Sequence, residues 1–121
     1  MIENKKFIEG DNAVREFKNK LKPIINSNKT FELRIKEITD KLQKVCVSWN
    51  IKGDDRVLSG FNLEASSAFN EMIEKELENI EDKDELNRIK DFVYGVSWLS
   101  DTWKSSLRVK IVMKNFKNSR V

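Results

Sequence analysis

The sequence predicts a mostly α-helical protein, a small bundle of four to five helices, and three observations lead to this fold class. The 121 residues include only four glycines and one proline, too few turn-forming residues for an all-β sandwich or barrel. Apolar residues recur at spacings of three and four in several long segments, which is the period of one helix face. Hydrophobic residues make up 39% of the chain and charged residues 36%, the balance of a small domain with a modest core. We therefore expect a single helical domain over residues 1–121, with a basic C-terminal segment at 102–121.

The first predicted helix follows Gly10, and Asp11 is its expected N-cap. Its apolar face repeats at helical spacing: Val14, Phe17, Leu21, and Ile24 or Ile25. Pro23 lies inside this run, and its ring clashes with the carbonyl four residues earlier. We therefore expect a kink there, or a helix end at 21–22. The polar residues 26–30 then form a loop that ends in Thr30, the predicted N-cap of the next helix.

The second predicted helix has the most regular apolar pattern of the chain. Six residues at alternating spacings of four and three fall within an arc of about 80° on a helix: Phe31, Ile35, Ile38, Leu42, Val45 and Trp49. Parts of the segment also alternate, so a hairpin with a strand at 44–51 is the alternative. The hairpin would leave Ile38 and Leu42 in its turn without burial, and the helix is therefore favoured.

A break at 52–61, with two glycines and an aspartate pair, precedes a third helix that we expect from about Asn62. Its apolar face contains Ala65, Phe69, Met72 or Ile73, Leu77 and Ile80. Its outer face is acidic, with Glu71, Glu74, Glu78 and Glu81. The pattern predicts an amphipathic helix that carries negative charge on its solvent side.

Asp82 or Asp84 can cap a fourth helix, whose apolar positions are Leu86, Ile89, Val93, Val96 and Leu99. The segment 92–99 is apolar nearly all round, so we expect it at the buried centre. One helix over 84–117 would be about 50 Å long, too long for this chain length. A break at 100–102 and a separate basic helix from Trp103 are expected instead. Residues 107–113 also alternate, so a terminal strand is the alternative there.

Charge is unevenly distributed along the chain. Residues 51–101 hold thirteen acids and six bases, whereas residues 102–121 hold six bases and no acid. The six are Lys104, Arg108, Lys110, Lys114, Lys117 and Arg120. In a helix, Lys110, Lys114 and Lys117 would share one face with Arg108 nearby, and an apolar face would form from Val109, Val112, Met113 and Phe116. This segment suits the acidic residues 71–85 of the same chain, an acidic protein groove, or phosphates.

The sequence lacks the residues that several kinds of catalytic and metal site require. The chain has no histidine, which excludes histidine-dependent triads and zinc sites with histidine ligands. It also has no glycine-rich phosphate loop. The single cysteine, Cys46, lies on or beside an apolar helix face and is interpreted as a small buried hydrophobe rather than a nucleophile. The acid pairs at 54–55 and 81–85 are typical of helix starts and lack metal-loop spacing. We expect no enzyme activity, no cofactor and no metal.

The expected location is the cytoplasm. No apolar run approaches the roughly 20 residues of a membrane span, the first residues lack a signal-like stretch, and a lone cysteine forms no internal disulfide. Small size and a composition rich in lysine and asparagine also suggest a phage or mobile-element protein.

The sequence therefore predicts a non-enzymatic interaction module: an accessory, adaptor or inhibitor subunit that binds a protein partner or associates with itself. The alternative is an accessory protein that binds nucleic acid through its basic segment. Neither a membrane nor a small-molecule substrate is indicated. The predicted contact residues are Trp103, Lys104, Arg108, Lys110, Lys114, Lys117 and Arg120. Trp103 stacks on a base or anchors a protein interface beside these cations, or it fills a gap between helices.

Overall fold

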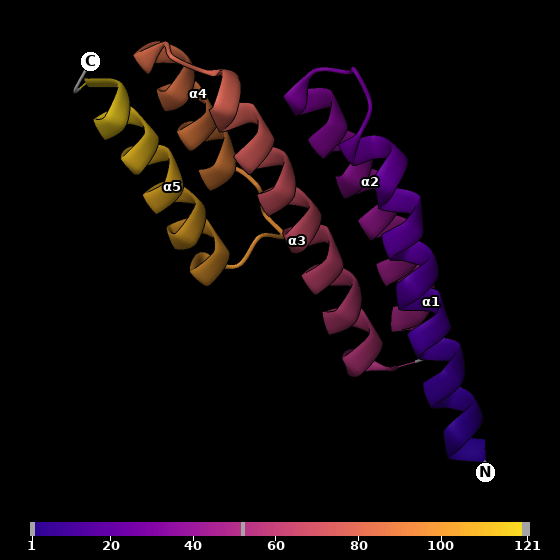
Figure 1. The fold of residues 1–121 in the computed structure, drawn as a ribbon. Coiled ribbons are helices and arrows are strands. Elements are labelled where there is room, and N and C mark those ends of the chain that lie inside the picture. The colour runs from indigo at the N-terminus through magenta and orange to yellow at the C-terminus, as the bar shows by residue number, and fades with distance from the viewer. Residues whose placement is uncertain (1, 52, 120–121) are drawn as a thin grey trace. The chain divides into compact units, whose positions relative to one another are not determined.

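The computed structural model describes the backbone of residues 2–51 and 53–119 and the side chains of residues 8–51 and 53–117. These ranges contain five α-helices and no strand, which confirms the predicted helical bundle (Figure 1). The helices are α1 (Ile2–Ile25), α2 (Phe31–Asn50), α3 (Asp55–Asn79), α4 (Lys83–Tyr94) and α5 (Asp101–Ser119). The strand alternatives at 44–51 and 107–113 are wrong, because α2 continues to Asn50 and α5 includes the whole of 107–113.

The chain divides into two compact units, and the division falls inside α3 between Phe69 and Asn70. The N-terminal unit contains α1, α2 and the first part of α3. The C-terminal unit contains the rest of α3, α4 and α5. The expectation of a single domain stays a prediction.

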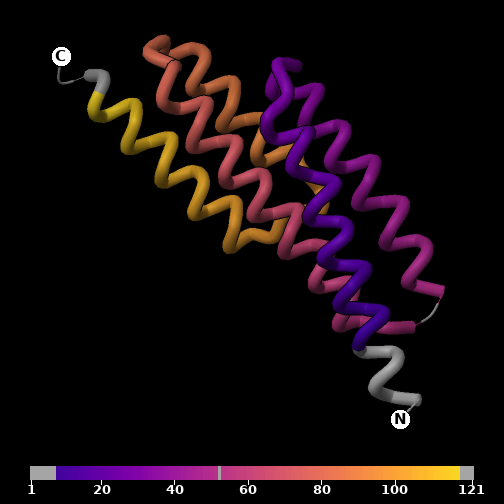
Figure 2. The backbone as a smooth tube through the Cα atoms, turned by 45° about the vertical axis from the view of Figure 1, so that its right-hand side comes forward, coloured from indigo at the N-terminus to yellow at the C-terminus, as the bar shows by residue number. Residues whose placement is uncertain are grey.

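In the N-terminal unit, α1 and α2 pack as antiparallel neighbours joined by the loop 26–30 (Figure 2). Thr30 is the N-cap of α2, as predicted, and its Oγ1 accepts a hydrogen bond from the backbone N–H of Leu33 at 3.3 Å. Arg34 is buried and donates from Nη1 to the carbonyl oxygen of Ile25 at 2.9 Å. This bond satisfies a carbonyl that the end of α1 leaves without a partner in the helix.

The predicted start of α1 was wrong, and so was the alternative that it ends at 21–22; the kink at Pro23 stays a prediction. The helix begins at Ile2, so that Gly10 lies inside it, and it ends at Ile25 with Pro23 in its last turn. Pro23 cannot donate to the carbonyl four residues earlier, and the helix continues only two residues past it. Asp11 is not an N-cap, and its Oδ1 accepts a hydrogen bond from Nη1 of Arg56 at 2.7 Å.

Two glycines that resemble helix breakers in the sequence are instead points of close helix packing. A Cβ atom at Gly10 would lie 2.5 Å from Cγ2 of Val57, closer than real side chains approach. A Cβ at Gly60 would lie 3.0 Å from Cγ2 of Val14. The glycines therefore let α1 and the first part of α3 approach each other closely. Helix α3 begins at Asp55, not near Asn62 as expected, so Gly60 lies inside it. At its start Oδ1 of Asp54 accepts a hydrogen bond from the backbone N–H of Val57.

Aromatic rings fill the core of the N-terminal unit. Phe61 packs edge-on against Phe17, with ring centroids 5.4 Å apart, and against Trp49 at 6.3 Å. Phe31 and Phe69 make a similar contact at 5.8 Å. Of the six apolar residues predicted to share one face of α2, four are buried, whereas Val45 and Trp49 are half-buried. The prediction is thus confirmed most clearly for the first three turns of that helix.

The C-terminal unit is built from short connections and capped helices. Asp82 is the N-cap of α4 and accepts from the backbone N–H of Asp84 at 2.9 Å, as predicted. The helix ends at Tyr94, earlier than expected, with Gly95 as its C-cap. Ser100 Oγ accepts from the N–H of Trp103 at 3.3 Å at the start of α5. The prediction of a separate basic helix is confirmed, but the break lies at 95–100 and α5 begins at Asp101, so the expected bounds of 100–102 were wrong.

The core of the C-terminal unit contains part of the segment 92–99 and apolar residues of α3, α4 and α5. Val93, Val96 and Leu99 are buried, but Tyr94 and Ser97 are exposed, so the expectation that 92–99 is buried all round was wrong in part. The other buried apolar side chains of the unit are Met72, Ile73, Leu77, Ile80, Leu86, Ile89, Leu107 and Ile111. Within the described residues, no helix is long and apolar enough to cross a membrane.

Candidate functional site

Helix α5 carries large apolar side chains on two opposite faces. Leu107 and Ile111 are fully buried. Val109, Val112, Met113 and Phe116 are between 48% and 60% exposed, and we name these four residues the apolar stripe. At about 100° per residue, the centre of the stripe lies roughly 180° from the buried pair. One face of α5 therefore packs into its own unit, and the other presents apolar surface to solvent.

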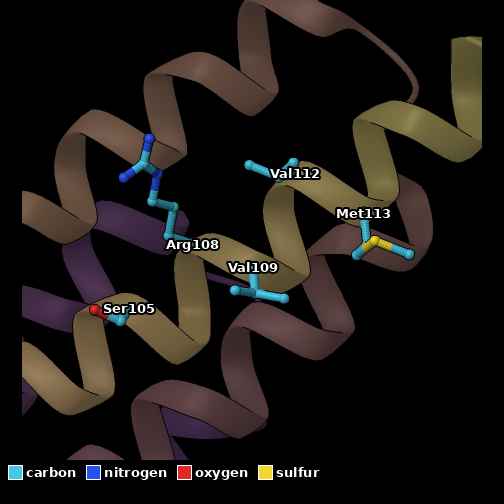
Figure 3. A pocket seen from close by; sticks show the side chains of 5 residues that line it. All are labelled: Ser105, Arg108, Val109, Val112 and Met113. Carbon is cyan, nitrogen blue, oxygen red and sulfur yellow. The ribbon is translucent and has the colours of Figure 1, made fainter.

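A shallow pocket of about 400 Å³ lies on this exposed face. Its lining residues are Ser105, Arg108, Val109, Val112 and Met113, and Figure 3 shows their side chains projecting from α5. Because all five come from one helix, the pocket is an open part of the surface and not an enclosed cavity. We call this open pocket the groove; sites for small molecules are usually more enclosed.

One cation of the basic segment pairs within the chain. Lys110 Nζ lies 2.6 Å from Oε1 of Glu74 and 2.6 Å from Oδ1 of Asn70, both on α3. The hydrogen bond and the positive charge of Lys110 hold the pKa of Glu74 below its usual value. The charge match predicted between the basic segment and residues 71–85 is therefore present at this pair.

The other described cations of the segment are placed differently. The guanidinium of Arg108 lies over the ring of Tyr94, 5.9 Å from its centroid, which holds the charge beside the apolar stripe. Lys104 and Lys114 are half-buried, and Lys117 is exposed. Within the described side chains, none of Lys104, Arg108, Lys114 and Lys117 forms an ion pair. Arg120 lies outside the described residues.

The cations occupy both flanks of the apolar stripe. By helical geometry, Lys104 and Arg108 lie on one side of it, and Lys110, Lys114 and Lys117 lie on the other. The expectation that Arg108 lies near the three lysines was therefore wrong, because it faces the opposite flank. Trp103 is half-buried at the start of α5. The arrangement is an apolar centre with a positive rim.

Sequence reasoning missed Tyr94 and Ser105. Tyr94 lies fourteen positions before the arginine that it contacts, and the segment around it is so apolar that it was expected inside the core. No local pattern predicts that contact. Ser105 was not singled out because a lone serine in a helix carries no signal of its own.

The groups that could support chemistry are few in the described residues. Cys46 is half-buried in α2, and burial raises the pKa of its thiol, which disfavours the reactive thiolate at neutral pH. No group of three or more metal-ligating side chains lies together in the part of the chain that the structure describes.

Comparisons with protein-family models, curated proteins and solved structures gave no match.

Proposed function

We propose that this protein is a non-enzymatic interaction module, an accessory, adaptor or inhibitor subunit, that binds a protein partner through the exposed face of α5. The observation that carries the proposal is the apolar stripe. Four large apolar side chains that share one face of α5 are about half exposed, although Leu107 and Ile111 on the same helix are buried. Removing such a surface from water is favourable by about 25 cal/mol per Å².

The distribution of charge around the stripe favours a protein partner over nucleic acid. Protein interfaces place apolar residues at the centre and polar or charged residues at the rim. A surface that follows a phosphate backbone instead places cations along the groove in which the backbone lies. Here Arg108 and Lys117 lie on opposite flanks, and Lys110 already pairs with Glu74. Trp103 is half-buried, which makes it a poor platform for stacking on a base.

Nucleic-acid binding is the second candidate. It is favoured by the four described cations of α5 that form no ion pair. Binding of this kind falls steeply as salt rises, because each phosphate contact releases a counterion. It should also depend on those cations and not on the apolar stripe.

Site-specific cross-linking in cells of the source organism tests the proposal. A photoreactive phenylalanine analogue at Met113 should give a discrete cross-linked protein, which mass spectrometry identifies. The same analogue at Asn87, an exposed position of α4, is the matched control and should give none. The proposal fails if the folded Met113 variant cross-links to no protein, or if it cross-links to nucleic acid instead.

Substitution is a better test than truncation. A chain ending at Trp103 would lose Leu107 and Ile111, which are buried in the C-terminal unit. Such a truncation would unfold this unit and remove the surface together. Changes confined to the exposed face separate the two effects.

A further inference from the structure

We infer that the partner surface is an acidic amphipathic helix, which docks along α5 with its apolar residues on the apolar stripe and its carboxylates on the flanking cations. This inference rests on the proposed function. It adds the chemical class of the occupant. Three steps lead to it: the sign of the rim, the poor fit of a second copy of this chain, and the shape of the groove.

The rim that α5 contributes to the stripe is positive. After Asp101 the sequence contains no acidic side chain, and of the described cations of the basic segment Lys110 is the one that pairs with an acid, Glu74 of α3. Arg108 and Lys117 are exposed on opposite flanks. A partner that covers the stripe must bring groups close to both cations, so acidic side chains there are attractive and basic ones repulsive.

A symmetric dimer through α5 fits this surface poorly. After Asp101, the charged residues on both flanks of the stripe are basic: Lys104 and Arg108 on one, and Lys110, Lys114 and Lys117 on the other. Two copies that pack through the stripe, parallel or antiparallel, therefore place one cationic flank beside another. Both arrangements bring like charges together at the rim, which destabilises the complex.

The acidic face of a second copy fits no better. Glu71, Glu74 and Glu78 are exposed on α3, but no large apolar residue is exposed anywhere between Leu63 and Tyr94. That face would supply the charges and leave the apolar stripe in contact with polar groups. The occupant therefore needs both features at once, and we assign it to another protein.

The groove also has the form expected for a helix. Its lining residues follow one helical row from Ser105 to Met113, and the stripe continues to Phe116. Side chains spaced in this way form a ridge and grooves that receive the apolar ridge of a second helix. Arg108 and Lys117 are nine residues apart, or about 13 Å along the axis. The matching carboxylates should lie on opposite flanks of the partner's apolar face at a similar separation.

Two synthetic peptides test the inference with the full-length protein. Both are amphipathic helices of about 20 residues with the same leucine stripe; one carries glutamate on its flanks, and the other carries lysine at the same positions. We expect the glutamate peptide to bind about tenfold more tightly at low salt, measured by fluorescence anisotropy. The double variant Arg108→Glu with Lys117→Glu should reverse that preference, because both substituted positions are exposed. Circular dichroism checks that the variant is folded.

A third variant separates failure of this inference from failure of the proposed function. Val112→Asp should abolish binding of the glutamate peptide. Equal binding of the two peptides, or an unchanged preference in the charge-reversed variant, overturns the acidic-helix inference while cross-linking at Met113 can still support a protein partner. Binding of a single-stranded oligonucleotide that depends on Arg108 and Lys117 but not on Val112 overturns both proposals.

Discussion

Helices α2 and α5 are both amphipathic, but they use their apolar residues in opposite ways. In α2 the regular apolar face is the buried one, with Phe31, Ile35, Ile38 and Leu42 inside the N-terminal unit. In α5 only Leu107 and Ile111 are buried, and the larger apolar set faces solvent. Helix α2 buries its regular apolar face within its own unit. Helix α5 leaves a set of comparable size about half exposed.

This difference indicates which apolar residues stabilise the fold and which are available for binding. Monomeric proteins often expose single apolar residues, and these need no explanation. Four neighbouring ones on one helix face, beside a groove, are the feature associated with interaction sites.

The largest effect should come from truncating the buried side chains of the two helices. Ile38→Ala in α2 and Leu107→Ala in α5 should each lower the free energy of unfolding by about 2–5 kcal/mol, because each removes a fully buried side chain and leaves a cavity. Val112→Ala on the stripe should change it by less than about 0.5 kcal/mol. Urea denaturation of the three variants measures these differences. A cost above about 1 kcal/mol for Val112→Ala would mean that the stripe belongs to the core.

The sequence predicted the helices better than it predicted their packing. Thr30 was identified as an N-cap, and Asp82 as one of two candidates, because capping is local chemistry between residues two or three positions apart. Gly10 and Gly60 were interpreted as breaks, because a glycine that ends a helix and one that lets two helices touch are identical in sequence. Only the opposing side chains, Val57 and Val14, distinguish the two cases.

The candidate site was predictable in part for a similar reason. Spacing alone gave the two apolar sets of α5 and the cations beside them. Which set is buried depends on α3 and α4, which lie far away in the sequence, so periodicity could not decide between them. The contact of Arg108 with Tyr94 and the position of Lys110 beside Glu74 are likewise tertiary features.

The close approach of α1 and α3 gives the next prediction. Gly10→Ala should destabilise the protein by about 1–3 kcal/mol, since the new Cβ would meet Val57 at 2.5 Å and overpacking outweighs the better helix propensity of alanine. Gly60→Ala should cost less, because Val14 lies 3.0 Å away. Adding Val57→Ala should partly rescue Gly10→Ala in thermal denaturation. Additive losses in the double variant would contradict this explanation.

The buried face of α2 contains one charged residue, Arg34. Replacing Arg34 tests how much its buried hydrogen bond stabilises the fold. Arg34→Met keeps much of the side-chain volume but leaves the carbonyl of Ile25 without its donor. We expect a loss of about 1–3 kcal/mol in the free energy of unfolding. Lys36→Met, at an exposed position of the same helix, is the control and should be nearly neutral. Equal stability of the two variants would show that the Arg34 bond contributes nothing.

The smallest effect should come from Glu74, the acid that pairs with the basic segment beside the apolar stripe. Lys110 lowers the pKa of Glu74 from its ordinary value of 4.5, so the folded state favours the carboxylate more than the unfolded state does. The stabilisation is fully present above pH 4.5 and is lost as the pH falls through the lowered pKa. Glu74→Gln should therefore melt slightly below the unmodified protein at neutral pH, and the two should converge in acid. The difference should also shrink as salt is added, because Glu74 is exposed. A difference in melting temperature that persists unchanged into acid would mean that the substitution acts through packing. The contact of α5 with α3 would then depend on Leu107 and Ile111 and not on the ion pair.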